Sequence, residues 1–195
     1  AERAARAIEA VPAALSDEDA AALFRDQGGV EAVCDGLLQF PEACALPALV
    51  ALRLLATQER AAAVVLKHRK GRAVVQALAW AQGAADEPEG QVAAGQIAAK
   101  SVEVLEALLQ HDETRKTLLA KAWNFSKPGA EQGAPSVRVK ALTAAASALL
   151  AEGAPAASAA LGALTNAAFD EKGKEAILGM ELAARGAKGS AFSFG

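Results

Sequence analysis

Apolar residues recur along the chain with the spacing of helices that bury one face. Residues 30–38 show the i, i+3, i+4, i+7, i+8 pattern, which gathers their apolar positions on one side of a helix. These positions are Val30, Val33, Cys34, Leu37 and Leu38. The pattern predicts a helix that starts after Gly28-Gly29 and ends at Phe40-Pro41.

The segment before this helix has the features of a helix start. Ser16 is expected to cap a helix with its hydroxyl, because an acid follows three residues later at Asp19. Gln27-Gly28-Gly29 is expected to end this helix.

From Glu42 to His68 the apolar residues are too dense for a surface helix, and the pattern predicts a helix packed on more than one side. Pro47 lies near its start, in the first turn or at a kink. The cations and glycine of residues 67–71 are expected to end it, because cations are favoured at a helix C-terminus.

Further helices are predicted over the rest of the chain. Their expected ranges are 72–82, 91–110, 114–122, 137–150, a segment that ends at Phe169, and 174–180. Long loops are expected at 83–90 and 126–136. We expect residues 1–184 to form a single helical domain and 185–195 to form an extended tail rich in Gly and Ser.

Three segments resemble one another, which predicts a repeated unit. They begin at Ala51, Glu106 and Gly162, and each consists of an apolar helix, a polar turn and a short apolar helix. They recur about every 55 residues, and a helical unit that recurs at such a spacing is typical of a solenoid.

The pattern is similar to the armadillo repeat. In that family a helix after a glycine pair, here Gly28-Gly29-Val30, is followed by a longer helix with the pattern ALxNLA, and residues 163–168 (Ala-Leu-Thr-Asn-Ala-Ala) are its closest copy. The resemblance covers residues 27–180 and implies an all-α fold: a right-handed α-solenoid of about three armadillo-like or HEAT-like repeats.

The resemblance also bears on the mode of binding. Armadillo proteins that hold extended peptides use a ladder of asparagines on the long helix. Asn166 fits that position, Gln110 is a partial match and Leu54 is not a match. We therefore do not expect binding of the nuclear-import kind.

Composition and charge narrow the classes of partner that we expect for this chain. The 195 residues are 53% hydrophobic and 22% charged, rich in alanine and without tyrosine, which favours helices. A net charge of −3 argues against a nucleic-acid partner. No run approaches the roughly 20 apolar residues of a spanning helix, so no membrane insertion is expected.

The candidates for chemistry are few. The two histidines, His68 and His111, have no Cys, Ser or carboxylate partner at a motif spacing, so we expect a capping or solvated role for each. No catalytic, cofactor or metal site and no small-molecule substrate is expected. Cys34 and Cys44 are expected to be buried and reduced, which favours a reducing compartment, the cytoplasm, with the cilium or an organelle as alternatives.

Six residues are candidates for partner binding. The basic cluster Arg69, Lys70 and Arg72 suits an acidic or phosphate-bearing partner, although helix termination also explains it. The others are Trp123 and Phe125 beside a long loop, and Asn166.

We therefore expect a non-catalytic protein-binding scaffold or adaptor, a structural subunit of a larger assembly such as an axonemal or organellar complex. The alternative is a transient regulatory binding module, such as a chaperone cofactor or a signalling adaptor.

Overall fold

The chain is all-α in the residues that its structure describes. A computed structural model describes residues 1–15, 17–74, 76, 91–119, 157–175 and 177, and every regular element within these ranges is a helix. The predicted loops at 83–90 and 126–136, the predicted helix at 137–150 and the tail at 185–195 lie outside them. So do most of the predicted helices at 72–82 and 174–180.

Four helices form the first part of the chain, before the long apolar stretch. They are α1 (Glu2–Glu9), α2 (Val11–Ala14), α3 (Glu18–Asp26) and α4 (Gly29–Gln39). The prediction that Ser16 caps α3 was wrong, because the N-cap is Asp17, whose carboxylate accepts a hydrogen bond from the backbone N–H of Asp19 at 3.0 Å.

The apolar stretch at 42–68 forms two helices rather than one: α5 (Pro41–Ala56) and α6 (Glu59–Lys67). The Thr57 hydroxyl donates to the carbonyl of Leu54 at 2.6 Å, and Gln58 is extended, so the helix ends there and a new one starts at Glu59. The likeness of the three repeated segments predicts a polar turn at this point. Pro41 occupies the first turn of α5, and Pro47 lies inside the helix.

The remaining described elements follow the predicted order. They are η1 (His68–Gly71), α8 (Gln91–Gln110), α9 (Asp112–Leu119) and α11 (Ala157–Ala167), and residues 171–175 are also helical. The prediction for 91–110 is confirmed, whereas α9 begins two residues before the predicted Thr114.

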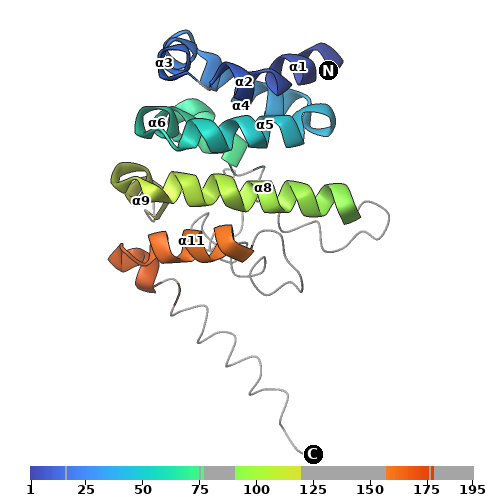
Figure 1. The fold of residues 1–195 in the computed structure, drawn as a ribbon. Helices are drawn as coiled ribbons and strands as arrows, with labels where there is room; N and C mark the ends of the chain where they lie inside the picture. Colours follow the sequence, from blue (N-terminus) through green and yellow to red (C-terminus); the bar gives the residue numbers. More distant parts are fainter. Residues whose placement is uncertain (16, 75, 77–90, 120–156, 176, 178–195) are drawn as a thin grey trace, which may run out of the picture.

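The long helices lie side by side in chain order. Helix α1 packs on α5, α5 on α8 and α8 on α11, so that Figure 1 shows them one below another. Helix α4 packs on α5. The short helices α3, α6 and α9 lie one below another along one side of this stack, at the left in Figure 1, together with the helical residues after α11.

Three layers of the stack can be aligned by the residue at which each short helix starts, and we call this alignment the common register. Helices α6 and α9 start at 59 and 112, and the last short helix starts at 171. Two residues before each start lies an exposed side chain, at Thr57, Gln110 and Phe169. Four residues before each start lies a buried one, at Leu55, Leu108 and Ala167. The intervals of 53 and 59 residues bracket the predicted spacing of about 55.

Candidate protein-interaction surface

Exposed and half-buried side chains of the stacked helices α5, α8 and α11, and of the turn after α11, make up a candidate surface. We call this the long-helix surface and define it by Leu46, Arg53, Glu103, Glu106, Thr165 and Phe169, all of which are exposed or half-buried. Side chains from neighbouring helices meet on it, so the three helices present a joint surface.

An ion-pair network joins α5 to α8 on this face. The Arg53 guanidinium Nε lies 3.2 Å from a carboxylate oxygen of Glu103. The ammonium of Lys100 donates to both oxygens of the same carboxylate, at 2.8 and 2.9 Å. Glu103 therefore holds two cations, one from each helix.

Glu106 joins α8 to α11 by a different contact. Its side chain lies against Gly162, where a Cβ atom would collide with the carboxylate. Burial raises the pKa of Glu106; the charge of Glu103 raises it further and Arg53 lowers it. The carboxylate thus loses part of its water where α11 crosses it.

Two large apolar side chains of the last stacked layer are open to solvent. Phe169 is 73% exposed and Leu161 is 57% exposed. Neither is among the residues that the sequence predicts to bind a partner. The signal that identifies Phe169 is its register, since the equivalent residues Thr57 and Gln110 are polar and exposed.

Asn166 lies between two helices rather than on an open ladder. Its side-chain N–H points to the backbone carbonyl of Glu106 at 3.5 Å, and the residue is half-buried. In the common register its equivalents are Ala107 and Leu54, so Gln110 does not share its position. Among the described long helices, α5 and α8 therefore carry no amide at this position.

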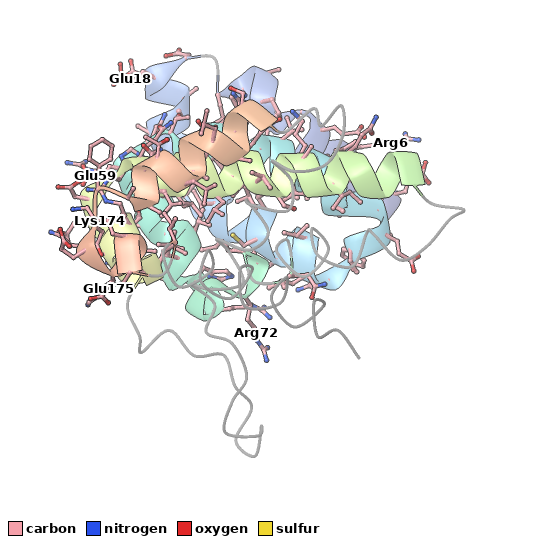
Figure 2. All side chains as sticks on the ribbon, turned by 90° about the horizontal axis from the view of Figure 1, so that it is seen from below. Arg6, Glu18, Glu59, Arg72, Lys174 and Glu175 are labelled. Atoms are coloured by element: carbon pink, nitrogen blue, oxygen red, sulfur yellow. The ribbon has the colours of Figure 1, made fainter. Side chains whose placement is uncertain are left out.

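The basic cluster is partly neutralised. The carboxylate of Asp35 on α4 lies 2.8 Å from His68 Nε2 and 2.7 Å from Arg69 Nε. Arg72 is exposed, and Figure 2 shows its side chain pointing away from the helices. The backbone of Lys70 lies in η1. Of the two arginines in this cluster, Arg72 is the more available to a partner, because Arg69 is paired with Asp35.

Both histidines have partners that sequence spacing did not reveal. His68 faces Asp35, which lies 33 residues away on another helix, so the ring pairs with a carboxylate that no motif spacing predicts. His111 Nε2 lies 2.9 Å from the backbone carbonyl of Ala56, which links the turn after α8 to the end of α5. Each ring therefore contributes to the packing of helices.

The remaining candidates for chemistry give no reactive group. Cys34 and Cys44 are buried, free thiols, as predicted. Burial, together with the charges of Asp35 and Glu31, raises the pKa of Cys34 to about 12, so this thiol stays protonated and a weak nucleophile. Within the described ranges, no group of three or more His, Cys, Asp or Glu side chains could hold a metal ion. Trp123 and Phe125 lie outside those ranges.

No described helix combines the length and apolar character that a membrane crossing needs. Comparison of the chain with protein-family models, with curated proteins and with solved structures finds no match.

Proposed function

We propose that the chain is a right-handed α-solenoid of about three armadillo-like or HEAT-like units that works as a non-catalytic protein-binding scaffold. In this proposal it is a structural subunit of a larger assembly, such as an axonemal or organellar complex. The side-by-side order of α1, α5, α8 and α11, each packed on the next, supports the solenoid.

The spacing of the short helices supports the armadillo-like class. Helices α3 and α6 start at Glu18 and Glu59, 41 residues apart, within the ~40 to 47 residues typical of armadillo and HEAT units. The next two intervals contain the segments 83–90 and 126–136, which the sequence predicts to be loops. Insertions of this kind lengthen a unit without changing its helices.

The observation that carries the binding function is the long-helix surface. It crosses three helices, has charged residues in its middle and ends at Phe169, an aromatic side chain that is 73% exposed. Exposed aromatic residues are favoured as anchors in protein interfaces, because they bury a large area at a small cost in side-chain entropy. We therefore propose that a protein partner lies across α5, α8 and α11 and covers Phe169.

Affinity purification from lysate of the native source tests this proposal. The tagged chain is compared with Phe169→Glu and with Leu23→Glu, a control that changes a 58% exposed leucine on α3, away from the long-helix surface. We expect the wild type and the control to retain the same partner in fixed stoichiometry. Phe169→Glu should retain about tenfold less, the loss of one anchor contact. Equal recovery with Phe169→Glu, or no retained partner under mild lysis, would contradict the proposal.

Exposed Arg72 favours the alternative, a transient regulatory module such as a chaperone cofactor or a signalling adaptor. A partner held by an exposed cation binds weakly and loses affinity in salt. Such binding should weaken in Arg72→Glu and be lost in a salt wash. Binding through Phe169 should survive the same wash.

The thiols support a reducing compartment, such as the cytoplasm, for this function. Cys34 and Cys44 are both free and buried, as is usual for structural cysteines in reduced proteins.

A further inference from the structure

The long-helix surface contains two carboxylates, and only one of them is paired. Glu103 binds the guanidinium of Arg53 and the ammonium of Lys100. Among the residues that the structure describes, no basic side chain lies within ion-pair distance of Glu106, and no N–H or O–H donates to its carboxylate. Arg53 acts on Glu106 through its charge, but its Nε is bound to Glu103.

The carboxylate of Glu106 lies against the backbone of α11. A Cβ atom at Gly162 would collide with its Oε1, so the glycine leaves the space that the carboxylate fills, although glycine is unfavourable in a helix interior. Helix α11 carries no charged residue, so it offers no cation in return. Glu106 is half-buried, and burial raises its pKa. The carboxylate thus loses water without gaining an ion pair, which is unfavourable for a charged group.

Asn166 connects this carboxylate to the exposed aromatic residue. The side-chain N–H of Asn166 points to the backbone carbonyl of Glu106 at 3.5 Å, and the backbone N–H of Phe169 donates to the carbonyl of Asn166 at 3.3 Å. Residues three apart are separated by about one helical turn. A partner segment that covers Phe169 therefore needs to extend only a short way to reach Glu106.

We infer that Glu106 is the ion-pairing residue of this surface: the partner segment that covers Phe169 carries an arginine whose guanidinium binds the Glu106 carboxylate. This inference rests on the proposed function and names the chemistry of its partner. Charge complementarity supports it, because a cation from the partner supplies the pairing that the described helices do not.

Arginine suits this position better than lysine. A guanidinium is more weakly hydrated than an ammonium, and it can donate to both oxygens of one carboxylate. An ion pair that is half-buried is also screened less by salt than one at the open surface. Within the described ranges, no group of three or more acidic, His or Cys side chains could hold a metal ion, so a metal fits less well than an organic cation.

Selection of short random peptides on the immobilised full chain tests the inference with a defined probe. Bound peptides are kept if they lose binding to Phe169→Glu. We expect these peptides to carry arginine beside an apolar residue, and to bind Glu106→Gln about tenfold more weakly than the wild type. Glu18→Gln is the matched control, an exposed carboxylate on α3, and should bind them as the wild type does.

Exchange of the peptide's arginine for citrulline separates a direct ion pair from an indirect effect of the substitution. Citrulline keeps the shape of arginine and lacks its charge. On the wild type this exchange should also weaken binding about tenfold. On Glu106→Gln it should weaken binding no further, because the two groups act as a pair.

The possible failures distinguish this inference from the proposed function. Absence of any peptide that depends on Phe169 would contradict both. Peptides that depend on Phe169 but lack arginine, or that bind Glu106→Gln as tightly as the wild type, would overturn the inference and leave the proposed function in place. An equal effect of citrulline on the wild type and on Glu106→Gln would also overturn it. Circular dichroism and urea unfolding of each variant verify that it is folded.

Discussion

At the scale of single residues, burial was predictable and polar partners were not. The apolar pattern in α4 correctly marked Val30, Val33 and Leu37, which are 0 to 1% exposed. The partners of His68 and His111 lie 33 and 55 residues away in the chain. Such a pairing depends on how helices stack, which local spacing does not contain.

Arg69 is held in a backbone conformation that suits glycine. Its φ is 44°, in the left-handed region, and its guanidinium is paired with Asp35. That conformation costs a residue with a Cβ atom about 1–2 kcal/mol, while a partly exposed ion pair returns about 0–1 kcal/mol.

Substitution of Arg69 separates these two effects. Arg69→Gly removes both the backbone strain and the ion pair, so its free energy of unfolding should equal or exceed that of the wild type. Arg69→Ala keeps the strain and loses the ion pair, and it should be less stable than Arg69→Gly by about 1 kcal/mol in urea unfolding. Equal stability of the two variants would show that the backbone is not strained.

Glu106 gives a stability effect that depends on pH. Its pKa is raised in the folded chain, chiefly by burial. The proton is therefore bound more tightly when folded, and its stabilising contribution is complete below the unfolded-state pKa and is lost as pH rises through the folded-state value.

Glu106→Gln keeps a neutral side chain at every pH. We expect this variant to be slightly more stable than the wild type at pH 7 and to lose that advantage below about pH 4, near the ordinary glutamate pKa. Glu103→Gln is the matched control and should be less stable at pH 7, because Glu103 binds Arg53 and Lys100. Urea unfolding at both pH values measures this. Destabilisation by Glu106→Gln at pH 7 would contradict the assigned effect of burial.

At the scale of helices, the sequence predicted the ends that glycine, proline or terminal cations mark, and it failed where a turn is built from ordinary residues. The glycines, prolines and terminal cations located the ends of α3, α4 and α6. The break between α5 and α6 has neither glycine nor proline, and apolar residues continue on both sides. Only the resemblance to the equivalent segments indicated the turn at Thr57.

Two glycines at the contacts of α11 differ in what an added methyl group would meet. At Gly173 a Cβ atom would collide with the backbone carbonyl of Ala167, and it would lie 3.2 Å from Leu119. At Gly162 the nearest atoms that it would meet belong to the flexible side chain of Glu106.

Gly173→Ala should therefore lower the free energy of unfolding by about 1–3 kcal/mol, because backbone must shift to make room. Gly162→Ala should be neutral or stabilising by up to about 1 kcal/mol, since Glu106 can move and alanine favours a helix interior. Thermal or urea unfolding of the two variants measures the difference. Equal effects would mean that Gly173 is not tightly packed against the end of α11.

At the scale of the whole molecule, the all-α class was predictable from composition and periodicity, and the order of the layers came from the structure. Sequence comparison paired Ala51 with Glu106 and Gly162, whereas the starts of the short helices pair Arg53 with Glu106 and Thr165. Alanine-rich helices match one another at several offsets, so the amino-acid sequence alone does not determine how the repeated segments align. Contacts between layers, such as that of Asn166 with Glu106, do fix it.

That register is also what identified the candidate site. It aligns the exposed Phe169 with the polar residues Thr57 and Gln110, and it aligns Asn166, which contacts Glu106, with Ala107 and Leu54. Of the residues predicted to bind a partner, Arg72 remains exposed and Arg69 is tied to Asp35.

Photo-crosslinking tests the central proposal, a protein partner across the long-helix surface, most directly. A photoreactive phenylalanine analogue replaces Phe169 in one chain and Leu23 in another, two exposed positions, one in the turn after α11 and one on α3. After illumination in native lysate, the account predicts one dominant protein adduct at position 169 that is absent at position 23. No adduct at 169, or the same set of adducts at both positions, would contradict it.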